Sequence, residues 1–299
     1  MRTLAALLLL ALSAPARAEP NPAEPIHVVA SFSILADLAR GAGGDAVEVT
    51  SLVGPDADPH GYEPRPSDAR KVAGASVLVL NGFGFDSWVD RLATASGFHG
   101  IRVVATAGVT PILHDGTPDP HAWQSAPNAI AYVDAIADGL AASRPDEADA
   151  IRASAAAYQS KLRTLDTEIR TTLQAVPQDR RTIVVPHRAF DYFGRAYGIA
   201  FLAPLGTNAD AEATGAEMAR VVDRLRRGEA QAIFTEHLED RRIVARIAAE
   251  ARLPITGELY SDALSGPSGP APDYVTLMRR NARLIAEALG PEAATKAQK

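Results

Sequence analysis

Residues Asp146 to Val176 read DEADAIRASAAAYQSKLRTLDTEIRTTLQAV, a stretch of about thirty residues that contains neither glycine nor proline. This composition favours a single long helix. Its apolar residues recur at steps of three and four and therefore line one face of that helix: Ile151, Ala155, Tyr158, Leu162, Leu165, Ile169 and Leu173. Such a helix measures about 45 Å. One small lobe does not require that length, so we interpret the helix as a rigid connector between two lobes.

The chain on each side of this helix alternates between short β-branched runs and helical stretches. This alternation is typical of an α/β protein with largely parallel sheets. Before the long helix, strands are expected at 26–31, 47–53, 76–81 and 101–105, and helices at 34–41, 67–75, 87–95 and 127–143. After it, strands are expected at 182–186, 199–205, 230–235 and 254–259, and helices at 188–197, 212–227, 240–251 and 273–289. The predicted fold class is therefore α/β, with two parallel-sheet lobes of four strands each joined by one long rigid helix.

The N-terminal residues resemble a secretory signal. Arg2 precedes the apolar run Leu4–Leu12, and Ala16-Arg17-Ala18 matches a small-x-small cleavage site. The apolar run is shorter than the roughly 20 residues that span a bilayer, so we expect export to the periplasm with cleavage near Ala18. The expected segments are a signal peptide at 1–18, an N-terminal lobe at 26–143, the linking helix at 144–177, a C-terminal lobe at 178–290 and a flexible tail at 291–299.

The composition excludes several classes of protein. The 299 residues include no cysteine and seven histidines. A disulfide framework, an iron–sulfur cluster and a cysteine nucleophile are therefore excluded, and any metal must be held by nitrogen and oxygen. A lipid anchor also needs a cysteine, so a free periplasmic protein is expected. The net charge is −6 and no long basic run is present, so no nucleic acid partner is expected.

Four polar side chains occupy positions where parallel sheets bind ligands. In open parallel sheets, ligands lie beyond the carboxyl ends of the strands. His60 follows the strand at 47–53, His121 precedes the helix at 127–143, His187 directly follows the strand at 182–186, and Asp262 follows the strand at 254–259. Two come from each lobe, so a metal in the interlobe cleft is expected. A zinc-type cation takes about four nitrogen or oxygen ligands, and three imidazoles with one carboxylate meet that number.

Four further segments of the chain are specific in sequence: Asp58-Pro59-His60-Gly61-Tyr62-Glu63-Pro64, Asp119-Pro120-His121-Ala122-Trp123, Pro186-His187-Arg188-Ala189-Phe190-Asp191-Tyr192-Phe193 with Tyr197-Gly198, and Tyr274 with Met278-Arg279-Arg280-Asn281. With these segments the chain resembles the zinc/manganese substrate-binding proteins of ABC importers, the cluster of periplasmic metal receptors with a rigid linking helix. The resemblance runs in order from about Ile26 to Leu289. The resemblance implies that His60, His121, His187 and Asp262 are the metal ligands, and that a membrane permease is a partner.

The expected ion is Zn(II), carried as the transported ligand. In the manganese receptors that the chain resembles, the third ligand is often a carboxylate, whereas here that position is His187. Imidazole-rich sets favour zinc, and added carboxylates favour manganese. A manganese-selective receptor of the same family, carrying Mn(II), is the alternative. We expect a monomer, with a periplasmic metallochaperone as a further candidate partner.

A secreted zinc-dependent hydrolase is the competing class. Such an enzyme holds zinc with three protein ligands and keeps the fourth position for water. Four candidate ligands close a tetrahedron, and neither a His-Glu-x-x-His nor a Gly-x-Ser-x-Gly motif is present. We therefore expect a receptor and no enzyme.

Several other residues near the predicted site are open to a functional or a purely structural interpretation. His114, in the short segment 113–119, either passes metal inward or is an ordinary residue of a solvated loop. Glu236 ends a predicted strand and is a candidate to steady an imidazole. Trp123 and Tyr62 each lie two residues beyond a predicted ligand, and they either pack in the core or shield the metal from water. The histidines at His27, His99 and His237 are expected to be structural or surface residues.

Overall fold

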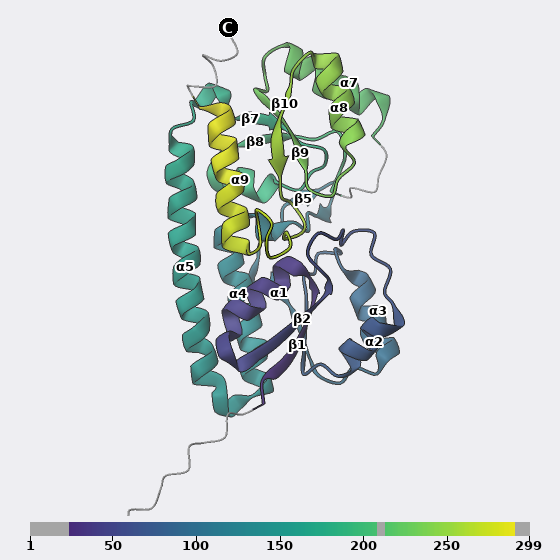
Figure 1. Cartoon of the computed structure of the whole chain (residues 1–299), viewed down its shortest axis with the longest axis vertical. Coiled ribbons are helices and arrows are strands. Elements are labelled where there is room, and N and C mark those ends of the chain that lie inside the picture. Colours follow the sequence, from purple (N-terminus) through teal and green to yellow (C-terminus); the bar gives the residue numbers. More distant parts are fainter. Residues whose placement is uncertain (1–23, 208–212, 291–299) are drawn as a thin grey trace, which may run out of the picture.

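Two four-stranded sheets, one above the other in Figure 1, form the frame of the molecule. The computed structural model describes residues 24–207 and 213–290. The first sheet has the order β2-β1-β3-β4 and comprises β1 (Ile26–Phe32), β2 (Val47–Val53), β3 (Val77–Leu80) and β4 (Ile101–Val104). The second has the order β10-β9-β7-β8 and comprises β7 (Thr182–Val184), β8 (Ala200–Leu202), β9 (Ala232–Glu236) and β10 (Ile255–Leu259). All pairings within these two sheets are parallel, and the predicted α/β class is confirmed.

Helices cover both faces of each sheet, which explains why the central strands are almost wholly apolar. The N-terminal lobe carries α1 (Ser33–Gly43), α2 (Pro66–Ala73), α3 (Ser87–Ser96) and α4 (Ala126–Ser143). The C-terminal lobe carries α6 (Asp191–Tyr197), α7 (Gly215–Arg226), α8 (Arg241–Ala251) and α9 (Tyr274–Leu289). In Figure 1, α1 and α4 lie on the side of the first sheet that faces the long helix, and α2 and α3 lie on the opposite side.

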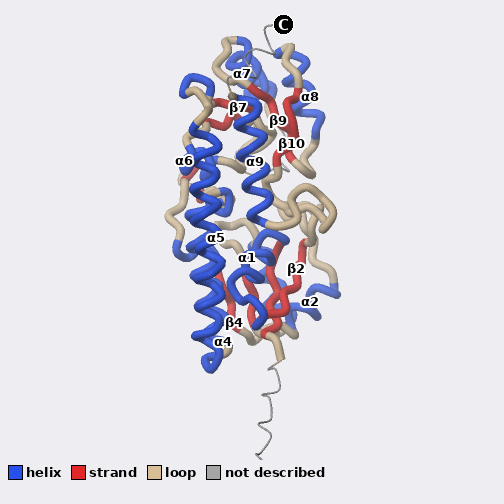
Figure 2. Tube along the Cα trace, turned by 60° about the vertical axis from the view of Figure 1, so that its left-hand side comes forward, coloured by secondary structure: helices blue, strands red, loops and turns tan. Residues whose placement is uncertain are grey.

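The predicted connector is the helix α5 (Ala148–Gln174), which follows a 3₁₀ turn at Pro145–Glu147. Its 27 residues give a length of about 40 Å, and it runs beside both lobes in Figures 1 and 2. Its buried stripe comprises Ile151, Ala155, Gln159, Leu162, Leu165, Ile169 and Leu173. Tyr158 was expected in this stripe, but Gln159 is the buried residue at this turn of the helix. Its burial is possible because its side-chain amide donates hydrogen bonds to Asp134 Oδ1 and to the carbonyl of Ile130. This stripe packs on α1, α4 and α9, and so joins the two lobes.

The hydrophobic core is continuous between the lobes. One cluster of buried residues extends from Ile26 in β1 to Leu289 in α9 and includes the inward face of α5. Trp123 and Tyr274 are fully buried within it. A second, smaller cluster lies under α7 and α8. The two lobes therefore share one packed interior, which limits their movement relative to each other.

Three features differ from the sequence-based expectation. The segment expected as a short loop at 113–119 contains a β-hairpin, β5 (Leu113–His114) and β6 (Thr117–Pro118), whose turn places Asp115 and Gly116 at positive φ. Asp-Gly is a strong signal for such a turn. The helix expected from residue 188 begins at Asp191, because the backbone before it turns to bond Gly206. The third difference is that strands β3, β4, β7 and β8 are shorter than expected.

Some expectations concern parts of the chain outside the described residues. The predicted signal peptide at 1–18, the tail at 291–299 and the start of the helix expected at 212 belong to these parts. Within the described ranges, none of the helices combines the length and the apolar character needed to cross a membrane.

Candidate metal centre

The structure brings the four predicted site residues together where the two lobes meet. His60 lies in a turn after β2, and His121 directly precedes the 3₁₀ turn at Ala122–Gln124. His187 follows β7, and Asp262 follows β10. Ligand-type atoms of all four lie within 4.8 Å of one another. The carboxyl ends of parallel strands in two facing sheets thus supply the cluster, as this class of fold favours.

The distances within the cluster are short and nearly uniform. Asp262 Oδ2 is 3.7 Å from His60 Nε2 and 3.3 Å from His187 Nε2, and Asp262 Oδ1 is 3.6 Å from His121 Nε2. The Nε2 atoms of His60 and His121 are 3.4 Å apart. A tetrahedral ion with ligand bonds of about 2.0–2.2 Å separates its ligand atoms by roughly 3.3–3.6 Å. These four separations, which involve both oxygens of Asp262, are close to those of a four-coordinate site.

Carboxylates orient the imidazoles from behind. His121 Nδ1 is 2.8 Å from Asp119 Oδ1, and His187 Nδ1 is 2.9 Å from Glu236 Oε2. Both contacts leave the Nε2 atom of the ring directed at the cluster, an arrangement that raises the basicity of metal-binding histidines. The sequence had suggested Glu236 for this position. It had not suggested Asp119, although the Asp-Pro-His motif contains it.

The electrostatics of the cluster favour a protonated, ion-paired state in the absence of metal. Burial alone lowers the pKa of His187, but the charges of Glu236 and Asp262 outweigh it and raise that pKa well above the ordinary value. Burial likewise opposes charge on His60, yet the adjacent carboxylate of Asp262 raises its pKa. Burial raises the pKa of Asp262, but His187, His60 and His121 together hold it well below the ordinary range. The carboxylate is thus ionised and faces three imidazoles.

The residues fit a bound cation on two further observations. His187 Nε2 and Asp262 Oδ1 are buried, and no described protein group forms a hydrogen bond with either atom. Buried polar atoms without partners are costly, and a metal ion would supply the missing partner to both. The side chains are also well enclosed, with exposed fractions of 7% for His60, 6% for Asp262 and 0% for the other two. This enclosure limits the access of water to a bound ion.

Aromatic rings form the wall of the cluster on the N-terminal side. Phe85 lies 4.8 Å from the His60 ring and 4.9 Å from the Trp123 ring, and Trp123 lies 5.2 Å from the His121 ring. Trp123 packs in the core, and its ring also contacts the ring of His121. Tyr62 only packs, since its ring contacts Trp88 and its hydroxyl donates to Asp68. Phe85 was not anticipated from the sequence, where it carries no motif.

The sequence of the chain also matches known proteins. Residues 28–288 match the family model described as Zinc-uptake complex component A periplasmic, or ZnuA. The chain belongs to this family.

The relatives of this ZnuA-family chain match it over most of their length. The manganese-binding lipoprotein MntA of Halalkalibacterium halodurans is 33% identical over 259 residues, which cover 86% of each protein. The iron-binding protein YfeA of Yersinia pestis is 31% identical over 293 residues, covering 93% of this chain and 92% of YfeA. Among solved structures, the periplasmic zinc binding protein TroA from Treponema pallidum matches with a TM-score of 0.83 at 25% identity, covering 89% of this chain and 99% of TroA.

Membership of the ZnuA family establishes the coarse function. The chain is a metal-binding component of an ABC importer that acts outside the cytoplasm, and it is a substrate-binding protein and not an enzyme. The names of the three relatives give manganese, iron and zinc. The choice of ion therefore depends on the donor atoms of this chain.

The remaining histidines occupy different environments in this ZnuA-family fold. His114 is three-quarters buried beside Asp191 and Arg188, so it is not an ordinary residue of a solvated loop. His237 stacks on Tyr260 and pairs with Asp56 from the other lobe. The other two, His27 and His99, are exposed.

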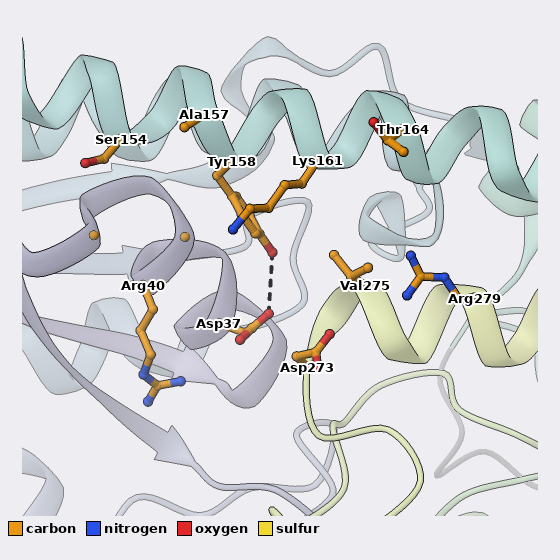
Figure 3. A pocket seen from close by; sticks show the side chains of 12 residues that line it. Asp37, Arg40, Ser154, Ala157, Tyr158, Lys161, Thr164, Asp273, Val275 and Arg279 are labelled. Atoms are coloured by element: carbon orange, nitrogen blue, oxygen red, sulfur yellow. Dashed lines mark hydrogen bonds between the residues drawn. The ribbon is translucent and has the colours of Figure 1, made fainter.

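A separate cavity of 720 Å³ lies between α1, α5 and α9 (Figure 3). Asp37 of α1 accepts hydrogen bonds from the Tyr158 hydroxyl of α5 and from the backbone N–H of Tyr274 in α9. Arg40, Lys161 and Arg279 also line the cavity, as Figure 3 shows. The cavity contains none of the four cluster residues, so it is separate from the candidate metal centre of this ZnuA-family protein.

Proposed function

We propose that this chain captures Zn(II) in the periplasm and delivers it to the membrane permease of an ABC importer. The ligands in this proposal are His60, His121, His187 and Asp262. The observation that carries it is the convergence of three imidazoles and one carboxylate, with ligand-type atoms within 4.8 Å of one another, in an enclosed cluster.

The donor set favours zinc over manganese. Three imidazoles and one carboxylate form a borderline-soft, four-coordinate set, whereas manganese prefers more oxygen donors in a six-coordinate arrangement. For a given site of nitrogen and oxygen ligands, zinc also binds more strongly than manganese in the general order of divalent ions. We propose that the two carboxylates behind the histidines, Asp119 and Glu236, strengthen this preference by keeping the Nε2 atoms aimed at one point.

Delivery to the permease requires that the ion can leave an enclosed site. A monomer in which the ion lies between two lobes can present that junction to a membrane partner, and a periplasmic metallochaperone is a further candidate partner. The importer then moves the ion and the receptor returns to solution. The proposed compartment is the periplasm, in keeping with the description of the family.

Calorimetric titration of the metal-stripped chain with Zn(II), and separately with Mn(II), tests this proposal. We expect tight binding of zinc at a single high-affinity site and much weaker binding of manganese. Asp262→Asn removes the only charged ligand, so it should weaken zinc binding by more than the roughly 10–100-fold that loss of an outer partner causes. Asp138→Asn makes the same chemical change at an exposed position of α4 and is the matched control.

Three results would contradict the proposal. If zinc binds only weakly, the chain is not a zinc receptor. Manganese binding as tight as that of zinc would favour the manganese-selective alternative. Equal zinc affinity in Asp262→Asn and Asp138→Asn would place the site elsewhere.

A further inference from the structure

A second cluster of ligand-type side chains lies beside the metal centre. His114 in β5, Asp119 in the loop before His121, and Asp191 in α6 place ligand atoms within 4.8 Å of one another. His114 Nε2 is 3.0 Å from Asp191 Oδ2 and 3.7 Å from Asp119 Oδ2. The first two residues belong to the N-terminal lobe and Asp191 to the C-terminal lobe. This cluster therefore also joins the two lobes.

The polar atoms of this second cluster lack sufficient partners. The Asp119 side chain is 0% exposed. Its Oδ2 atom, like His114 Nε2, forms no hydrogen bond with any described residue. Burial and the nearby charge of Asp119 also raise the pKa of Asp191, against the opposing charges of Arg188, His114 and His121. A fully buried carboxylate oxygen of Asp119 that lacks a hydrogen bond, close to the second carboxylate of Asp191, is a costly arrangement that a cation would stabilise.

Asp119 connects the two clusters. Its Oδ1 atom holds His121 Nδ1 and the backbone N–H of His121, while its Oδ2 atom faces His114. The Asp119 carboxylate of the Asp-Pro-His motif thus contacts both clusters, one with each oxygen. The hairpin that carries His114 is fixed to α6, because the Tyr192 hydroxyl accepts from the N–H of Ile112 and donates to the carbonyl of Asp119.

We propose that His114 Nε2, Asp119 Oδ2 and a carboxylate oxygen of Asp191 form a second site for a divalent transition-metal ion. One imidazole and two carboxylates are donors that zinc and manganese both accept. Three protein donors leave at least one position to water, so this site is weaker than the four-donor centre. The side chains of His114 and Asp191 are 25% and 26% exposed, which gives an ion access from solvent. The inference goes beyond the proposed function because it concerns a separate ion.

Arg188 competes with an ion for this second site. Its Nη1 atom lies 3.2 Å from His114 Nδ1, and its Nε atom lies 3.9 Å from Asp191 Oδ2. An arginine can only donate, so this contact uses the lone pair of Nδ1 and leaves the proton of a neutral imidazole on Nε2. Metal binding through Nε2 needs the opposite tautomer. Arg188 must therefore turn away when an ion binds, toward the solvent to which its side chain is 42% exposed.

Zinc titration of the metal-stripped full chain by calorimetry, with the bound ions counted by equilibrium dialysis, tests the second site. The unaltered protein is expected to bind zinc in a tight step followed by a weaker one. Asp191→Asn keeps the shape of the side chain but removes its charge, so the weaker step should be lost. The tight step should persist and shows that the variant is folded. Asp115→Asn is the matched control, since Asp115 is exposed at the tip of the same hairpin.

The Arg188→Gln variant tests the assigned ligand atoms, because it should strengthen the weaker binding step that Asp191→Asn should abolish. Removing the competing cation should strengthen the weaker step by about tenfold, which corresponds to about 1.4 kcal/mol. An unchanged weaker step in this variant would show that the ion does not use His114 Nε2, and would overturn the assigned ligand set.

The outcomes separate this inference from the proposed function. A tight step with no weaker step in the unaltered protein, or a weaker step that survives in Asp191→Asn, overturns the second site and leaves the proposed function intact. The absence of the tight step itself overturns the proposed function instead.

Discussion

Protons and zinc compete for the same atoms of the metal centre. In the metal-free protein, the pKa values of His60 and His187 are raised because the ionised Asp262 and, for His187, Glu236 favour the imidazolium form. A zinc ion can bind only to the deprotonated Nε2 atom, so binding releases these protons. Because the pKa values are raised, the competition begins at a higher pH than for an ordinary histidine.

We predict that stabilisation of the protein by zinc grows as the pH rises from about 5.5 to about 7.5. The raised histidine pKa values stabilise the metal-free fold fully below the unfolded value of about 6.5, and this contribution is lost as the pH rises through the folded values. The lowered pKa of Asp262 acts in the opposite sense, but only in strong acid. The measurement is the difference in Tm with and without zinc at each pH.

Two histidine variants provide the comparison for this pH dependence. His187→Gln removes one competing imidazole and a proposed ligand, so the zinc-induced shift in Tm should become small at every pH. His99→Gln changes an exposed histidine and should leave the profile unaltered. A zinc-induced shift that stays constant across this pH range would contradict the assigned protonation.

The single residues of the site divide into those that the sequence predicts and those that it does not. His60, His121, His187 and Asp262 each follow a strand or precede a helix, so sequence alone predicted their meeting, and their role as ligands stays a prediction. The support from Asp119 depends on which way a carboxylate turns inside a loop. Phe85 reaches the site through a loop with Phe83 at positive φ. Neither the orientation of the Asp119 carboxylate nor the position of Phe85 follows from the local sequence pattern.

At the scale of single elements, the helix α4 packs against the first sheet without room for an added methyl group at one position. A Cβ atom at Gly139 would overlap Cγ2 of Val103 in β4. Gly139→Ala would gain about 1 kcal/mol of helix propensity, but overpacking of this kind costs roughly 1–3 kcal/mol. We predict a net loss in the free energy of unfolding, measured by urea denaturation.

Gly215→Ala is the matched control for this helix substitution. Gly215 is the first residue of α7 and is exposed, and no described atom lies within 4 Å of the place that an added methyl group would take. This variant should be as stable as the unaltered protein or slightly more stable. Equal stability of the two alanine variants would mean that α4 and β4 are not packed as closely as described.

The elements themselves follow from local pattern to differing degrees. The stripe of α5 was predicted almost residue by residue, because a period of 3.6 over 27 residues is a strong signal. The hairpin at 113–118 was not predicted, since each of its strands has two residues and no alternation. Its Asp115-Gly116 turn was the available signal. The predicted strands β7 and β8 extended beyond the observed ends at Val184 and Leu202, because the chain there leaves the sheet as loops.

At the scale of the whole molecule, hydrogen bonds tie the lobes together next to the metal centre. The Trp123 indole N–H and the Gln124 side-chain amide both donate to the carbonyl of Ser261, at 2.9 and 2.7 Å. The Tyr274 hydroxyl donates to the carbonyl of Trp123 at 2.6 Å. These groups are buried in the core shared by both lobes, where an unpaired hydrogen-bonding group costs about 1–3 kcal/mol. The residue beside Asp262 is thus fixed to the opposite lobe.

We therefore predict that zinc binding moves loops and not lobes. Opening the lobes would break the bonds to the Ser261 carbonyl and expose part of the shared core, and α5 braces both lobes along its length. Small-angle X-ray scattering of the metal-free and zinc-bound full chain should give the same radius of gyration within error. A clear decrease on adding zinc would show that the lobes close as hinged bodies.

The double variant Trp123→Phe with Gln124→Met tests whether those bonds are the restraint. It removes both donors to the Ser261 carbonyl but keeps apolar bulk in the core. Its metal-free form should then have a larger radius of gyration than the unaltered protein, and zinc should reduce the difference by pulling His121 and Asp262 together. If the double variant scatters like the unaltered protein in both states, the restraint lies in α5 and the shared core instead of the hydrogen bonds.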